Sequence, residues 1–107
     1  MVEFTLNDTL HTLVCTLDGR FGADVNEIFS AKLDDKIEIS RKSIDDPGKL
    51  KICFDMKNVT FIASAFIRIC LATSRQIDAE NFSIINASPM IKKTFKIANL
   101  DRMLHVT

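Results

Sequence analysis

The stretch Lys49–Gln76, KLKICFDMKNVTFIASAFIRICLATSRQ, decides the fold class of this chain. Its first part, Leu50–Met56, is a nearly continuous apolar run, which is typical of a central strand covered on both faces. Its second part predicts a helix that begins near Ser64 and runs to about Ile77. A buried strand followed directly by a helix indicates an α/β fold.

The segment between this strand and this helix is predicted to be irregular. Lys57-Asn58 leads out of the strand. Val59, Phe61 and Ile62 are expected to pin the resulting loop to the core.

The residues before this stretch predict a hairpin followed by a helix. Val2–Leu6 alternates apolar and polar residues, Asn7-Asp8 is a turn signal, and the alternation resumes from Leu10 to Leu17. Asp18-Gly19 and Gly22 are expected to break the second strand. Asp24 and Glu27 then have the spacing of a capping box. The helix after them should reach at least Leu33 and is expected to extend to Ile37. Its apolar positions recur at helical spacing: Val25, Ile28, Phe29, Leu33 and Ile37.

The residues after Gln76 predict one more strand and one more helix. Phe82–Ile85 is the strand, and Ser88-Pro89 is a good helix start, with Ser as N-cap and Pro at the first position. The apolar stripe of that helix is expected to hold Ile91, Phe95 and Ala98, and Leu104 and Val106 form a possible short closing strand. The whole pattern predicts one α/β domain over residues 1–107, with a mixed sheet of four or five strands and helices packed against it.

Composition excludes several classes of protein. The chain has 107 residues, 14 Lys and Arg, and 14 Asp and Glu, so its formal net charge is zero, which argues against a nucleic-acid partner. The N-terminus lacks a signal-peptide pattern, and no apolar run approaches the length of a bilayer span, so we expect a cytoplasmic protein with no direct membrane insertion. Three cysteines without paired spacing indicate free thiols in a reducing compartment.

Ser64 is the residue of greatest chemical interest. A hydroxyl at the threshold of a helix lies near unpaired backbone N–H groups and the positive end of the helix dipole, which is a natural place for a phosphate. The alternative is that Ser64 serves only as an N-cap.

The chain resembles STAS domains, the family of bacterial anti-sigma factor antagonists and sulphate-transporter tails. The resemblance rests on Phe54-Asp55-Met56, on Val59–Ile62 and on Ser64 with the helix after it. Leu17–Phe21 followed by Asn26 is similar to the family's entry to its first helix. Asn86–Pro89 and Asn99–Arg102 are similar to its last strand and helix.

This resemblance implies a binding module that changes partners. In the family, the unphosphorylated domain binds a serine kinase that doubles as an anti-sigma factor, the kinase phosphorylates one serine, and a phosphatase restores binding. The matching position here is Ser64. The family's Asp-Ser-Ser-Gly is replaced by Ala63-Ser64-Ala65-Phe66, so the hydroxyl is kept while the other three residues are not.

The helix from Ser64 is more apolar than one buried face requires. Ile67, Cys70, Leu71 and Ile77 are assigned to the core face, and Phe66, Ile69 and Thr73 lie to one side. This second stripe indicates either an interface or a broad core face. Together with the resemblance it predicts a partner-binding surface, with Phe66 or Ile69 exposed, made of Asp18, Arg20, Asn26, Ser64, Phe66, Arg68 and Ile69.

No other pattern indicates catalysis, a metal or a cofactor. His11 and His105 are far apart and lack supporting carboxylates, and there is no phosphate-binding loop. Lys92, Lys93 and Lys96 form a basic helix face of the kind that is usually solvated.

Two readings of the family therefore stay open. The first is an anti-sigma factor antagonist controlled at Ser64. The second is the STAS subunit of a membrane lipid-transport ABC complex, which would bind its ATPase constitutively. A small-molecule enzyme is disfavoured because no catalytic constellation is present.

Overall fold

A computed structural model describes residues 2–107 of the chain. Its strands and helices alternate along the sequence, with two single-turn 3₁₀ helices, Pro47–Lys49 and Ala79–Asn81, in the connections. The elements are β1 (Val2–Asn7), β2 (Thr12–Phe21), α1 (Ala23–Ser43), β3 (Lys51–Ile62), α2 (Ser64–Gln76), β4 (Phe82–Ile85) and α3 (Pro89–Ile97).

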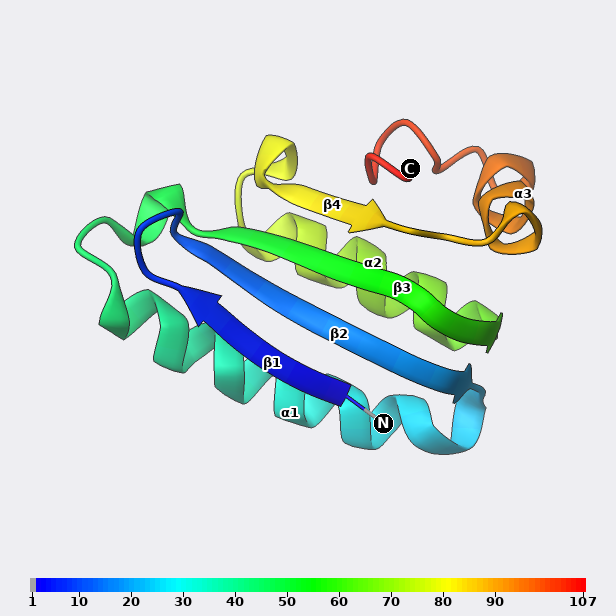
Figure 1. Cartoon of the computed structure of the whole chain (residues 1–107), viewed down its shortest axis with the longest axis horizontal. Helices are drawn as coiled ribbons and strands as arrows, with labels where there is room; N and C mark the ends of the chain where they lie inside the picture. The colour runs from blue at the N-terminus through cyan, green and yellow to red at the C-terminus, as the bar shows by residue number, and fades with distance from the viewer. Residues whose placement is uncertain (1) are drawn as a thin grey trace.

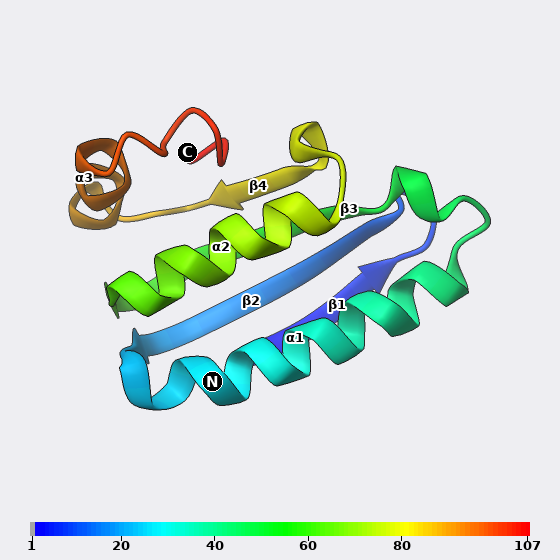
Figure 2. The ribbon, with the colours of Figure 1, turned by 180° about the vertical axis from the view of Figure 1, so that it is seen from behind.

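The strands form one four-stranded mixed sheet in the order β1-β2-β3-β4. β1 and β2 make the predicted antiparallel hairpin, whereas β2–β3 and β3–β4 are parallel pairs. The crossover helices α1 and α2 both cover the same face of the sheet, and α3 lies beyond β4 (Figures 1 and 2). The α/β architecture, the four-stranded mixed sheet and the interior place of Leu50–Met56 in it are confirmed.

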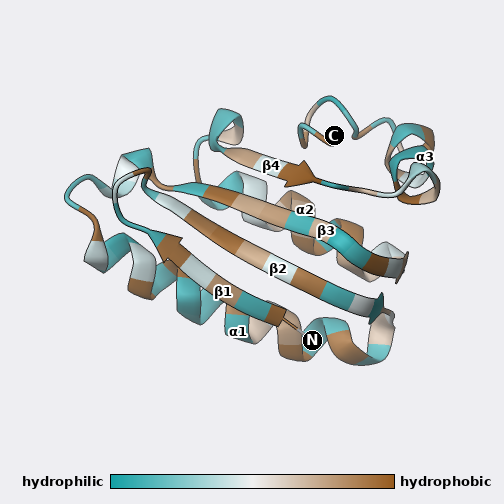
Figure 3. Ribbon diagram, viewed as in Figure 1, coloured by the Kyte–Doolittle hydropathy of each residue, from teal (hydrophilic) through white to brown (hydrophobic). Residues whose placement is uncertain are grey.

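The core lies between the sheet and the helices α1 and α2. Alternate residues of β2 from Leu13 to Leu17 and of β3 from Ile52 to Met56 are buried in it, which places apolar side chains in bands along the central strands (Figure 3). The largest fully buried side chains are Leu13, Leu17, Leu33, Ile37, Leu50, Ile52, Phe54, Met56, Phe66, Phe82, Ile84 and Phe95.

Both parallel strands at the centre extend further than the sequence pattern predicts. Asp18-Gly19 does not end β2: the strand continues to Phe21 with register shifts between Thr16 and Asp18 and between Gly19 and Arg20. Gly19 has φ of +94°, a conformation that favours glycine, so the dipeptide produces an irregularity inside the strand. The expected loop over residues 57–62 is likewise part of β3, because it pairs with this extended β2.

Helix α1 differs from its prediction at its start and runs past the minimum length expected at its end. Its N-cap is Gly22 and no side chain caps it, so the expected capping box of Asp24 and Glu27 is wrong. The helix continues to Ser43, beyond Ile37. Phe29, Leu33 and Ile37 face the core as expected, but Val25 and Ile28 are exposed.

The C-terminal residues close one edge of the sheet. Ser88 caps α3 as predicted, with its Oγ accepting from the Ile91 N–H at 3.3 Å. Ala98, expected in the apolar stripe of α3, is exposed. In place of a closing strand, Val106 forms a single parallel bridge to Ile84, where the Thr107 N–H donates to the Ile84 carbonyl at 2.9 Å.

Candidate partner-binding site at the start of helix α2

Ser64 is held by the ends of the two central strands. β3 ends at Ile62, and the Ala63 N–H donates to the Phe21 carbonyl, at the end of β2, at 2.9 Å. α2 begins at the next residue, so the Ser64 side chain stands exposed at the first helical position. The parallel pairing of β2 and β3 therefore fixes where this hydroxyl lies.

Asn26 of α1 forms a second hydrogen bond at this junction between the end of β2 and the start of α2. It is 3% exposed, and its Nδ2 donates to the Phe21 carbonyl at 3.4 Å. The Phe21 carbonyl thus accepts hydrogen bonds from Ala63, just before α2, and from Asn26 near the start of α1. The Asn26 Oδ1 is buried and has no hydrogen-bond partner among the described residues. Asn26 was predicted as a surface contact, but it lies inside and positions the start of α2.

The first turn of α2 is not capped by a side chain. Its N-cap is Ala63, in the extended conformation usual for that position, so the alternative that Ser64 is the N-cap is wrong. The Ala63 carbonyl accepts from the N–H groups of Phe66 and Ile67. The N–H groups of Ser64 and Ala65 precede these, and no intrahelical acceptor is available to them. Two backbone donors therefore remain at the serine.

The missing cap leads to a stability prediction. We expect Ala63→Asp to raise the free energy of unfolding by about 1 kcal/mol, because an N-cap carboxylate accepts from a first-turn N–H and complements the helix dipole. Ala72→Asp, on the exposed middle of the same helix, is the matched control and should not stabilise. Urea denaturation of the two variants measures the difference, and equal midpoints would contradict the capping argument.

Phe66 lies in the core, so the expectation that it forms part of an exposed contact surface is wrong. It is 0% exposed. Its ring lies 5.3 Å from that of Phe21, 6.0 Å from that of Phe29 and 6.1 Å from that of Phe54, measured between centroids. Because Phe66 points inward, it leaves the approach to Ser64 open.

Asp18 and Arg20 lie at the same end of the sheet but on the face away from the helices. The buried Phe21 and Ile62 point toward the helices, so their neighbours Arg20 and Phe61 point the other way. The Arg20 guanidinium carbon is 4.5 Å from the centre of the half-exposed Phe61 ring, a cation–π contact. Asp18 is exposed on the same face of β2.

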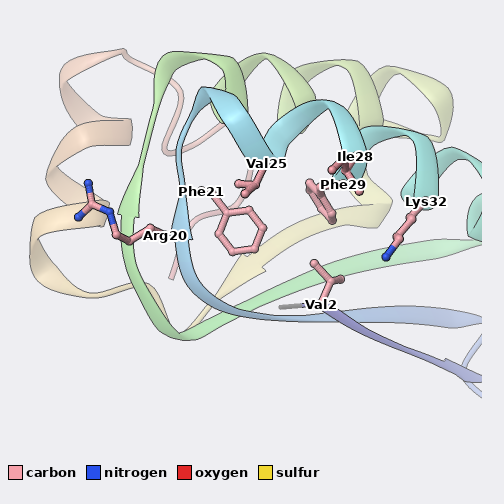
Figure 4. Close-up of a pocket in the computed structure, with 7 residues that line it drawn as sticks. All are labelled: Val2, Arg20, Phe21, Val25, Ile28, Phe29 and Lys32. Atoms are coloured by element: carbon pink, nitrogen blue, oxygen red, sulfur yellow. The ribbon is translucent and has the colours of Figure 1, made fainter.

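A small pocket lies between this end of β2, the start of β1 and helix α1. It has a volume of about 180 Å³ and its floor is formed by Phe21 and Phe29 (Figure 4). The Arg20 side chain turns away from the pocket, whereas the Lys32 side chain extends toward β1 (Figure 4). Its lining holds no pair of groups suited to acid–base or nucleophilic chemistry.

A longer groove runs between α1 and α2, from the start of α2 toward its C-terminal end. It consists of two adjoining hollows of about 480 and 270 Å³, which share Ser30, Asp34 and Ile69. Ile69 is half-buried at its centre, and Arg68 is exposed at its rim. Small side chains form much of the remaining lining: Ala23, Ala31, Ala65 and Ala72.

The structure thus brings together only some of the residues that were predicted to form the partner-binding surface. Ser64, Arg68 and Ile69 lie together on α2 beside the groove, with Asn26 beneath its upper end. Asp18 and Arg20 belong to the opposite face. Phe61 was expected to pin the segment after Met56 to the core, but it is 40% exposed on the face away from the helices, so that expectation is wrong. Sequence reasoning missed the alanines of the groove. The only sequence signal for the groove is that small residues recur on α1 and α2.

The cysteines do not supply a reactive thiolate. Burial raises the pKa values of Cys15 and Cys70 well above the ordinary range, and burial is also the main cause that raises the pKa of the half-buried Cys53. All three therefore remain protonated near neutral pH. Within residues 2–107, no cluster of His, Cys, Asp and Glu has the arrangement needed to hold a metal ion. No helix in the same range combines the length and apolarity needed to cross a bilayer.

Comparisons with known proteins give structural matches only. No family model matches the sequence, and no curated protein matches it either. Three solved structures illustrate the matches to the fold. An anti-sigma factor antagonist STAS domain protein from Planctomyces limnophilus has a TM-score of 0.76 at 15% identity, over 99% of this chain and 87% of its own.

Two further structures extend this comparison. An anti-sigma factor antagonist from Mycobacterium paratuberculosis has a TM-score of 0.75 at 16% identity, over 99% of this chain and 85% of its own. SpoIIAA, a cell fate determinant of Bacillus in its phosphorylated form, has a TM-score of 0.65 at 20% identity, over 100% and 91%. The sheet order and the crossover helices are thus part of a known framework, and this chain has the fold of SpoIIAA and the STAS domain proteins.

Proposed function

We propose that this chain is a partner-switching regulator of the anti-sigma factor antagonist type. It binds a serine kinase that acts as an anti-sigma factor, and phosphorylation of Ser64 releases it. The observation that carries the proposal is the exposed hydroxyl at the first position of α2, beside backbone donors without intrahelical acceptors. Phosphorylation of Ser64 requires ATP, and we place this change of partners in the cytoplasm.

In the unphosphorylated state, the partner rests on the exposed start of α2 and the upper end of the groove. Ile69 supplies an apolar contact that is already half-buried, and Arg68 supplies a charge at the rim. Because Phe66 and Asn26 anchor the start of the helix, this surface is formed before the partner arrives, which lowers the entropic cost of binding.

A phosphate on Ser64 is well accommodated by the chain itself. It adds roughly −1.5 to −2 charge at neutral pH. The N–H groups of the first turn and the helix dipole favour an anion there, and Arg68, four residues on, lies on the same side of the helix. The same charge disfavours contact with an acidic or apolar partner surface. The phosphorylated protein is therefore stable alone and binds its partner weakly.

The phosphorylated and unphosphorylated forms of SpoIIAA, both of which share this fold, support the proposal. Nothing in the motif at Ser64 is otherwise kept, since Ala63, Ala65 and Phe66 replace the Asp, Ser and Gly of the family. The proposal therefore depends on the hydroxyl and its position. A phosphatase that acts on Ser64 completes the cycle.

The test compares three baits: the wild type, Ser64→Ala and Ser64→Asp. We expect capture from the native lysate to yield a protein with an ATP-dependent serine kinase activity that phosphorylates the wild type at Ser64 and leaves Ser64→Ala unmodified. With that purified kinase, Ser64→Ala should bind as tightly as the wild type. Ser64→Asp should bind at least about tenfold more weakly, which is roughly 1.4 kcal/mol. Calorimetry measures the affinities and mass spectrometry locates the phosphate.

A matched control separates the switch from general charge effects. Ala79→Asp adds the same charge at an exposed position beyond the end of α2, outside the lining of the groove, and should retain nearly full affinity. Equal affinities for the wild type, Ser64→Ala and Ser64→Asp, with no phosphate on Ser64, would exclude the switch. Constitutive binding to a transporter ATPase would then be the better reading.

A further inference from the structure

Helix α3 places three lysines around one hollow of the surface. Lys92, Lys93 and Lys96 line a hollow of about 540 Å³ between α3 and the segment after it, with Pro89, Asp101 and Val106 as the remaining lining. Asp101 is the single acidic residue among them. The hydrogen bonds of residues 105–107 to Ile84 hold the far wall against β4. The hollow is therefore cationic and has one fixed side.

The exposed surface of α3 also carries the most exposed large apolar side chains of the described residues. Ile97 is 76% exposed and Met90 is 74% exposed. They lie seven residues apart, so they share one stripe of the helix with Lys93 between them. Pro89, Lys92 and Lys96 form the neighbouring stripe, which faces the hollow. The buried face of the helix, with Ile91 and Phe95, is separate and packs into the core.

This local charge contrasts with the neutral chain as a whole. Residues 88–107 hold four of the 14 Lys and Arg residues and only one of the 14 Asp and Glu residues. A further apolar side chain in this range, Met103, is 55% exposed. Lysines interleaved with bare aliphatic side chains match the two layers of a membrane surface, which are anionic headgroups and the acyl boundary beneath them.

We propose that the exposed face of α3 binds anionic phospholipid surfaces. The lysines take headgroup phosphates at the hollow, and Met90 and Ile97 enter the acyl boundary. A free phosphate would use the hollow alone, whereas a lipid surface offers anionic phosphates and an apolar layer together. The lipid surface uses both stripes, so it is the occupant that the geometry favours. This binding is independent of the Ser64 switch.

The test measures sedimentation of the full chain with sucrose-loaded vesicles. We expect binding to phosphatidylcholine vesicles that contain phosphatidylglycerol, weakening as salt is added, and none to pure phosphatidylcholine vesicles. The triple variant Lys92→Gln, Lys93→Gln and Lys96→Gln should lose at least about tenfold in partitioning, because each lysine near an anionic surface is attracted to it. Met90→Ser with Ile97→Ser should lose several-fold. All these side chains are exposed, and circular dichroism verifies that the variants fold.

The matched control makes the same charge change at the other end of the molecule. Lys36→Gln, Lys42→Gln and Lys49→Gln lie on the far part of α1 and in the turn after it, distant from α3 in both views (Figures 1 and 2). This variant should stay within a few-fold of the wild type. An equal loss in both triple variants would reduce the effect to net charge and overturn the proposal. Loss of vesicle binding on addition of glycerol 3-phosphate would identify a free-phosphate site instead, and equal binding to neutral vesicles would exclude headgroup recognition.

Discussion

Replacing Phe66 by alanine should lower the free energy of unfolding by about 3–5 kcal/mol, the cost typical of deleting a buried phenylalanine. The side chain has no exposed area and contacts three other aromatic rings, from β2, α1 and β3. Its removal leaves a cavity where these elements meet. Such a loss is a large part of the stability of a small domain, and urea denaturation measures it.

The control for this experiment is Phe61→Ala. Phe61 is the same residue type in the same region, but it is 40% exposed and points away from the helices. We expect a loss of less than about 1.5 kcal/mol, because little apolar area is buried there and only the contact with Arg20 is broken. If the two variants lost equal stability, the placement of Phe66 in the core would be wrong.

The second large effect is expected from Asn26→Asp, and it depends on pH. The variant has nearly the same shape as the wild type, but above its pKa it puts a buried carboxylate beside the Phe21 carbonyl. Burial disfavours the charged form and raises the pKa in the folded state by about two units or more above the unfolded value of about 3.9. At pH 7 this removes roughly 3 kcal/mol from the free energy of unfolding.

The sign of this dependence follows from the raised pKa. At least about one pH unit below the unfolded pKa of about 3.9, the carboxyl group is neutral in both states. Its hydroxyl then donates to the Phe21 carbonyl, and stability stays close to that of the wild type. As pH rises through the folded pKa, this stability is lost. Asn58→Asp, at an exposed position, is the control and should show no such loss. A constant difference between Asn26→Asp and the wild type from acid to neutral pH would show that the side chain is not buried at this junction.

Local signals in the sequence predict the parts of the fold that local chemistry determines. Ser88-Pro89 starts α3 because a cap and a preset φ act within a few residues. The apolar run Leu50–Met56 correctly predicts an interior strand. The expected cover on both faces is wrong, because α1 and α2 lie on the same face and buried residues alternate with less buried ones along this run (Figures 1 and 2). The same reasoning places Ser64 at the start of α2, although it assigns the cap to the wrong residue.

The errors arise where a residue's role depends on a distant part of the chain. Helix α2 is apolar around most of its circumference, so spacing alone does not decide whether Phe66 or Ile67 faces the sheet. The cluster of Phe21, Phe29 and Phe54 decides it. Asp18-Gly19 looks like a strand end, yet pairing with β3 carries β2 past it. Asn26 came from the family resemblance alone, and only the structure shows that it acts by bonding to the Phe21 carbonyl.

The two edges of the sheet differ in a way that concerns self-association. At β4 the backbone is covered by residues 105–107, through the bridge of Val106 to Ile84. At the other edge, β1 pairs with β2 on one side only. Its outward row of N–H and C=O groups is a template for another strand, which a short strand with an exposed Glu3 discourages. Within residues 2–107, a strand from a second chain can therefore be added to this sheet only beside β1.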